Sequence, residues 1–165
     1  MDKRRAAIGS AVFFLAAPGI VAGLIPYLLT GGWQDPGPWP AQVIGAMLVV
    51  AGLVAVIDAF VRFVREGVGT PAPIAPTQHL VVGGLYRHVR NPMYVAVLMI
   101  IIGQALWFTH LGVLIYGAVA WAVTAAFVRF YEEPTLTSTF GEEYLEYRRN
   151  VGAWLPRLTP WKSLD

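Results

Sequence analysis

The stretch Leu85–Met99 reads LYRHVRNPMYVAVLM and marks the boundary between a polar loop and a long apolar segment. Pro92 suits the first turn of a helix, and the residue before a proline is disfavoured in helical geometry. A helix is therefore expected to begin at this proline. Directly before it the chain gathers three side chains that carry or can carry positive charge: Arg87, His88 and Arg90. A membrane anchor alone needs fewer charges than this.

Outward from this boundary the chain is strongly apolar. Its 165 residues are 56% hydrophobic and 13% charged, with a mean hydropathy of +0.57. This composition, with long apolar segments, is typical of an integral membrane protein. The absence of cysteine excludes disulfides, thiolate metal sites and cysteine nucleophiles. The basic residues lie beside apolar segments and form no separate patch, so nucleic-acid binding is not indicated.

Four apolar segments predict membrane-spanning helices, at residues 6–29, 41–61, 93–108 and 112–128. A signal peptide is the alternative for the first, but this segment exceeds the roughly 7–15 apolar residues of such a peptide. Only three residues, 109–111, separate the last two segments, so a tight helical hairpin is expected. The expected fold is an all-α integral membrane protein of about four transmembrane helices, one domain over residues 1–165, with a C-terminal amphipathic cytoplasmic helix.

Every Lys and Arg falls on one side of this arrangement. They precede the first segment, separate the second from the third, and follow the fourth, whereas the loops GGWQDPGPWP and THL contain none. The positive-inside rule then places both termini and the middle loop in the cytoplasm. Because the outer loops are short, a functional site is expected on the inner face, between the middle loop and the C-terminal tail.

The middle loop carries more polar groups than anchoring explains. Gly83 and Gly84 permit positive φ angles and close approach by a ligand. The helix that starts at the proline offers free N–H groups, which favour anions or carbonyl oxygens. Positive anchors beside a helix start would explain the arginines, but not the cluster formed by Tyr86, Asn91 and Tyr94. A ligand site is the alternative interpretation.

The tail contains an apolar stripe and a pair of acids. The stripe recurs at helical spacing and predicts an amphipathic helix on the membrane or folded under the bundle: Leu136, Phe140, Tyr144, Tyr147 and Val151. Glu132 and Glu133 stand where the fourth span leaves the membrane, and Arg129 is spaced to pair with either. Two interpretations stay open: a solvated pair bridged by Arg129, or a carboxylate directed at a ligand amine or hydroxyl.

Polar residues within the spans have simpler interpretations. Asp58 precedes Arg62 by four residues, so the two are expected to pair near the inner interface. Gln104 is expected to form a hydrogen bond between helices. The three histidines have no metal-ligand spacing, so no metal site is predicted.

Two sequence blocks together resemble a known superfamily. HLVVGGLYRHVRNPMY at residues 79–94 and EEPTLTSTFGEEYLEYRRNVGAWLPR at residues 132–157 flank the expected helical hairpin. In order and composition they resemble the two motifs of the isoprenylcysteine carboxyl methyltransferase and phospholipid methyltransferase superfamily, which includes prokaryotic integral-membrane methyltransferases. The resemblance covers roughly the C-terminal half of the chain.

The resemblance implies a cofactor, S-adenosylmethionine, bound at the cytosolic side by blocks 79–94 and 129–157, with S-adenosylhomocysteine as product. The cofactor-binding residues that it implies are His79, Leu80, Val81, Val82, Gly84, Tyr86, Asn91, Pro92, Met93, Tyr94 and Glu132. Catalytic roles are implied for Glu132, Glu133 and Arg129, and no metal is required.

The implied reaction is methyl transfer to a lipophilic small molecule in the bilayer of a prokaryotic inner membrane. The acceptor could be a carboxylate, an amine or a hydroxyl; the last two need a general base, for which Glu132 or Glu133 could serve. Two alternatives are an NADPH-dependent membrane reductase of the sterol-reductase type and a small membrane protein without enzymatic activity.

Overall fold

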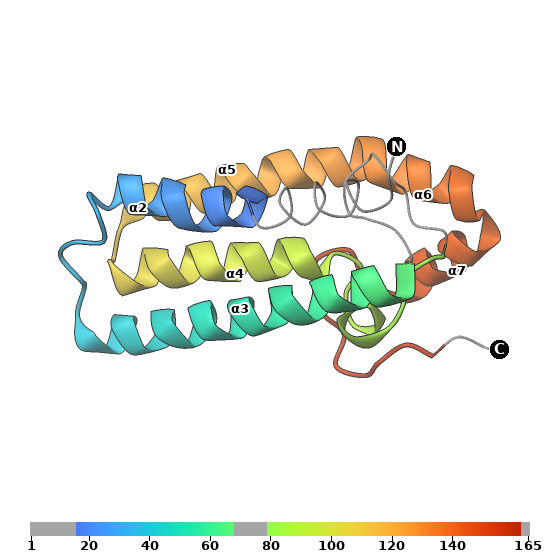
Figure 1. The fold of residues 1–165 in the computed structure, drawn as a ribbon, viewed down its shortest axis with the longest axis horizontal. Helices are drawn as coiled ribbons and strands as arrows, with labels where there is room; N and C mark the ends of the chain where they lie inside the picture. The colour runs from blue at the N-terminus through green and yellow to red at the C-terminus, as the bar shows by residue number, and fades with distance from the viewer. Residues whose placement is uncertain (1–15, 68–78, 163–165) are drawn as a thin grey trace, which may run out of the picture.

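The computed structural model describes residues 16–67 and 79–162. Within these residues the fold is helical and contains no β-strand, which confirms the predicted all-α class. Residues 16–29 form a first helix, which includes the π-helical turn η1 (Ile20–Leu24) and α2 (Ile25–Leu29). This helix lies alongside three longer ones in a bundle (Figure 1): α3 (Trp39–Gly67), α4 (Pro92–Trp107) and α5 (Leu111–Phe127).

Two helices in the described part of the chain are long and apolar enough to cross a membrane. They are Trp39–Arg62 and the continuous helix Leu111–Phe140, of which α5 forms the first part. The helices Ala16–Leu29 and Pro92–Trp107 are apolar but shorter. Residues 6–15 of the first predicted span lie outside the described residues. The scheme of four spans and the orientation of the termini therefore stay predictions.

α3 and α4 pack backbone against backbone through small residues. A Cβ added at Gly45 would lie 2.5 Å from the carbonyl oxygen of Gly103, and one added at Gly103 would lie 2.7 Å from that of Gly45. Farther along, a Cβ at Gly52 would lie 2.8 Å from the carbonyl oxygen of Ala96. Small residues allow close helix contact in membranes, where apolar side chains gain little by leaving lipid.

Gln104 ties the first helix to α4. Its amide nitrogen donates to the carbonyl oxygen of Ala22 at 2.6 Å, and its amide oxygen accepts from the indole of Trp33 at 3.1 Å. The predicted hydrogen bond between helices is therefore confirmed. Tyr116 on α5 adds a second tie, because its hydroxyl donates to the carbonyl oxygen of Val21 at 2.8 Å. These bonds fix the first helix against both of its neighbours.

The polar segments gather at one end of the bundle (Figure 1). Residues 79–91, here called the α4-entry segment, contain the 3₁₀ turn η2 (Gly84–Arg87) and lead into α4. At the same end α5 continues through the π-helical turn η3 (Val128–Glu132) into α6 (Glu133–Phe140), and α7 (Glu142–Asn150) follows.

The tail forms two helices because Gly141, at φ +54°, interrupts the predicted stripe. This positive φ is accessible to glycine at little cost. The stripe is nevertheless a single packing surface after the chain bends. Its buried members are Tyr144, Tyr147 and Val151, and the partly buried residues packed against them are Leu80, Val82, Leu136, Phe140 and Trp161.

Gly45→Ala should destabilise the bundle, because the added methyl group forces α3 away from the Gly103 carbonyl. Overpacking of this kind costs about 1–3 kcal/mol, which would appear as a lower thermal unfolding midpoint of the detergent-purified protein. Gly23→Ala is the matched control, since a Cβ there would meet no heavy atom of the described residues within 4 Å. Equal midpoints for the two variants would contradict the close backbone packing.

Candidate functional site

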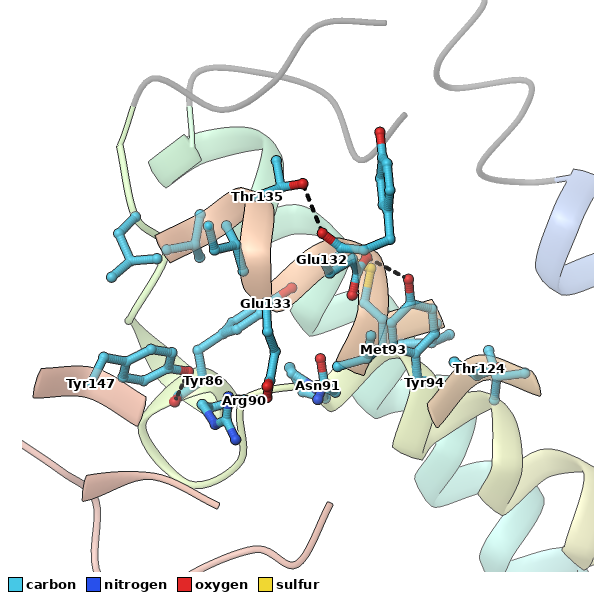
Figure 2. Close-up of a pocket in the computed structure, with 18 of the residues that line it drawn as sticks. Tyr86, Arg90, Asn91, Met93, Tyr94, Thr124, Glu132, Glu133, Thr135 and Tyr147 are labelled. Carbon is cyan, nitrogen blue, oxygen red and sulfur yellow. Dashed lines mark hydrogen bonds and ion pairs between the residues drawn. The ribbon is translucent and has the colours of Figure 1, made fainter. Parts of the chain in front are cut away.

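A cavity of about 400 Å³ lies where the α4-entry segment meets α4. Its walls come from the first helix, α3, α4, α5, the η3 turn, α6 and α7, so segments far apart in the sequence share one hollow (Figure 2). Pockets for small molecules and cofactors occupy roughly 300–1,000 Å³. The cavity is therefore the candidate functional site of the described residues.

Most of the residues implied by the sequence line this cavity: Leu80, Val81, Tyr86, Asn91, Pro92, Met93, Tyr94, Glu132 and Glu133. Four others lie outside its lining: His79, Val82, Gly84 and Arg129. The proline-led start of α4 and the two adjacent acids, although about forty residues apart, thus face the same space.

The four residues outside the lining have other surroundings. His79 is exposed at the start of the described segment, and Val82 packs against the buried tyrosines of α7. Gly84 has the positive φ that the sequence allows, at +53°, but the group that approaches it is the guanidinium of Arg62. Arg129 has a side chain 63% exposed.

Tyr94 and Glu132 form the polar pair at the cavity wall. The hydroxyl of Tyr94, in the first turn of α4, donates to Oε1 of Glu132 at 2.7 Å (Figure 2). No Arg or Lys of the described residues forms an ion pair with Glu132, in contrast with the acid beside it. The Tyr94 ring also lies 6.4 Å from that of Trp154 in the tail, measured between ring centroids. Glu132 is therefore the acid that can still take a ligand group.

Glu133 is engaged by three guanidinium groups. It is 6% exposed, and its Oε1 accepts from Arg90 at 2.7 Å, while Oε2 lies 3.2 Å from both Arg129 and Arg148. Of the two pairings expected for Arg129, the structure thus shows the one with Glu133. Both oxygens of this acid serve to join the α4-entry segment to α6 and α7.

Besides its ion pair with Glu133, Arg90 forms hydrogen bonds that hold the tail under the bundle. Its Nε donates to the carbonyl oxygen of Val151 at 2.9 Å and its Nη1 to the hydroxyl of Tyr144 at 3.0 Å. Its backbone N–H donates to the carbonyl oxygen of Gly152 at 2.9 Å. Sequence reasoning missed this role, because an arginine before an apolar segment carries the same signal whether it anchors in lipid or binds backbone carbonyls.

The other polar residues of the α4-entry segment also bind the tail. Asn91 donates to the carbonyl oxygen of Ala153 at 3.0 Å. Arg87 exchanges backbone and side-chain bonds with Trp161, at 2.9 and 2.6 Å. His88 accepts the backbone N–H of Arg157 at its carbonyl oxygen, 2.9 Å away. The charge gathered before Pro92 is therefore largely committed to holding residues 151–161.

Tyr147 fixes the position of the α4-entry segment from the side of α7. Its hydroxyl donates to the carbonyl oxygen of Tyr86 at 2.6 Å (Figure 2). Burial raises the pKa of Tyr147 well above its usual value, so the phenol stays protonated and keeps donating. Both tyrosines line the cavity, which makes this bond part of its wall.

The remaining lining residues were not identified from the sequence. They are mostly apolar and come from several helices: Ala17, Pro18, Val21, Val56, Val97, Thr124, Val128, Tyr131, Thr135 and Leu136. The cavity thus joins a polar wall at Tyr94 and Glu132 to an apolar wall within the bundle. Such a site can hold a molecule that carries a reactive polar group and a hydrocarbon part.

Comparison with known proteins identifies a protein family. A model of the phospholipid methyltransferase family matches residues 40–143, from the first turn of α3 into α7. The matched range contains α4, α5 and both adjacent acids, in agreement with the resemblance seen in the sequence. No curated protein matches the chain.

Glu133→Gln should strongly destabilise the protein, because it leaves the buried guanidinium of Arg90 without its counter-charge. Breaking a buried ion pair costs about 3–5 kcal/mol, to be measured as a loss of thermal stability in detergent. Glu142→Gln is the matched control: Glu142 is paired with Arg149, but its side chain is 85% exposed, and exposed pairs contribute about 0–1 kcal/mol. Similar losses in both variants would refute the special role of Glu133.

Proposed function

Because the chain belongs to the phospholipid methyltransferase family, we propose that it transfers a methyl group from S-adenosylmethionine to a lipophilic acceptor within the membrane. The family itself indicates methyl transfer to a lipid. The observation that carries the finer proposal is the Tyr94–Glu132 pair, which combines an aromatic face and a carboxylate in one cavity.

The cavity lining fits the chemistry of this cofactor. S-adenosylmethionine supplies a methyl group on a cationic sulfonium, together with an amine and ribose hydroxyls. Tyr86 and Tyr94 offer aromatic faces, which attract cations by roughly 0.5–2 kcal/mol, and Glu132 offers a carboxylate to an amine or hydroxyl. We propose that these three residues hold the cofactor, with Leu80, Val81, Asn91, Pro92 and Met93 as further wall.

Glu132 also suits the proton transfer that some acceptors require. An amine or hydroxyl acceptor must lose a proton, and Glu132, a half-buried carboxylate that forms no ion pair with an arginine of the described residues, can take it. Arg90, the single cation in the described lining, is bonded to Glu133 and so offers little to an acceptor carboxylate. The arrangement favours an amine or hydroxyl over a carboxylate. The apolar wall would take the hydrocarbon part of the acceptor.

The alternatives receive less support from the same residues. An NADPH-dependent reductase needs cationic groups for the 2′-phosphate, and the described lining contains only Arg90, which is already engaged. A protein without enzymatic activity would leave the polar pair Tyr94–Glu132 beside an apolar cavity unexplained.

Cofactor binding is testable by calorimetry of the detergent-purified protein with S-adenosylhomocysteine. We expect saturable binding that Tyr94→Ala weakens about tenfold, because the variant removes part of the cavity wall and the hydrogen bond that orients Glu132. Tyr27→Ala is the matched control, since Tyr27 does not line the cavity and packs on Trp33 near the other end of the bundle. Absence of saturable binding, or equal weakening by both variants, would count against the proposal.

The reaction is testable with membranes that contain the protein and methyl-labelled S-adenosylmethionine. We expect label in the lipid extract, and a drop of about 100-fold or more in its initial rate for Glu132→Gln if this residue removes the proton. An unchanged rate would exclude Glu132 as the general base. Hydride-labelled NADPH, supplied in parallel, gives the reductase its own test.

A further inference from the structure

The chain after α7 turns back toward the bundle and passes beside the start of α4 (Figure 1). Residues 151–162 are here called the returning tail. The carbonyl groups of three consecutive residues in it accept hydrogen bonds of 2.9–3.0 Å from Arg90 and Asn91: Val151, Gly152 and Ala153. These bonds fix the first part of the returning tail against the α4-entry segment, and they set the position of the residues that follow.

Trp154 shows how far the returning tail reaches along the bundle. Its ring centroid lies 6.4 Å from that of Tyr94 on α4 and 6.2 Å from that of Trp121 on α5. Trp121 stands six residues before Phe127, the last residue of α5, which is about 9 Å along a helix. It is 46% exposed and belongs to the apolar helix Leu111–Phe140, which is long enough to cross a membrane. The returning tail therefore contacts a part of α5 that a membrane would surround.

Beyond this contact the returning tail exposes apolar side chains. Leu155 is 84% exposed and Leu158 is 99% exposed, the two highest values for large apolar side chains among the described residues. A single exposed leucine needs no explanation, but these two closely follow Trp154. The returning tail also contains Arg157 and Lys162 but no acid. Tryptophan and leucine together with cations are typical of segments that lie in a membrane interface.

The backbone of the returning tail is bonded to the protein, which lets its exposed side chains face lipid. Besides the three carbonyl groups, the N–H groups of Arg157 and Trp161 donate to the carbonyl oxygens of His88 and Arg87, both at 2.9 Å. An irregular backbone is costly in lipid because its polar groups lose their water partners. Here the α4-entry segment supplies partners for these groups, so the cost is reduced.

We propose that Trp154, Leu155 and Leu158 lie in the boundary between lipid headgroups and acyl chains at this end of the bundle. The partner of this surface is the bilayer itself. The apolar stripe of the tail, for which the sequence allowed a place on the membrane, packs within the protein, and the membrane contact comes from the residues after it. The inference requires that α5 lie in a membrane but does not depend on methyl transfer.

Spin labels test this directly, because the chain contains no cysteine and each single-cysteine variant takes one label. The full chain is reconstituted in vesicles of phosphatidylcholine and phosphatidylglycerol. Collisions of the label with oxygen, which enters the bilayer, are compared with those of a nickel chelate, which stays in water. For Leu155→Cys and Leu158→Cys we expect an immersion depth of about 5–10 Å.

Two further positions calibrate the measurement. Val123→Cys, 65% exposed on α5, is the reference for lipid, and Glu142→Cys, at a side chain 85% exposed on α7, is the reference for water. Collision ratios at Leu155 and Leu158 equal to the ratio at Glu142 would overturn the proposal. A water-like ratio at Val123 would overturn it as well, since the proposal requires α5 in lipid.

A second pair of variants separates insertion of the native side chains from insertion of the label. Leu155→Asp, added to Leu158→Cys, should reduce the immersion depth, because a carboxylate is costly to remove from water. Arg149→Gln, added to the same variant, removes a charge 68% exposed on α7 and should leave the depth unchanged. An unchanged depth with Leu155→Asp, or equal decreases with both changes, would contradict a membrane contact made by this segment.

Discussion

The buried ion pair between Arg90 and Glu133 is the contact on which the candidate site depends. It joins the segment that enters α4 to the helix that continues α5, and the same arginine binds the backbone of the tail. Two charges removed from water must be paired to be tolerated, and their partners must then stay in place. The pair therefore fixes the start of α4 relative to the start of α6, and with them the positions of Tyr94 and Glu132 in the polar wall of the cavity.

Glu132 and Glu133 have different surroundings because successive residues of a helix point about 100° apart. Glu133 points into a set of guanidinium groups, while Glu132 points to a tyrosine hydroxyl at the cavity. Glu133 holds the surrounding helices together through its ion pairs. Glu132 has no ion pair with an Arg or Lys of the described residues. This division supports the proposal that an amine or hydroxyl binds at Glu132.

Local patterns predicted the helices well, and α4 begins at the proline that the sequence indicates. The residues that line the polar wall were also accessible, because they fall within the two blocks of the family resemblance. The contacts of Arg87, Arg90 and Asn91 with the tail could not be predicted from the sequence, because hydrogen bonds between residues sixty or more positions apart leave no periodic pattern. Nor could the sequence tell Glu132 from Glu133, because only the position of the neighbouring helices decides which acid each arginine meets.

The π-helical turn Val128–Glu132 ends at Glu132 and stands directly before Glu133. Such a turn accommodates one more residue than a regular α-helix in the same length, and it frequently occurs at functional sites. It sets the rotation of everything that follows, so deletion of one residue within it would turn α6 by about a quarter of a revolution. During evolution, such a deletion could change which of Glu132 and Glu133 faces the cavity and which faces the arginines. The substrate preference could then change without a mutation of either acid.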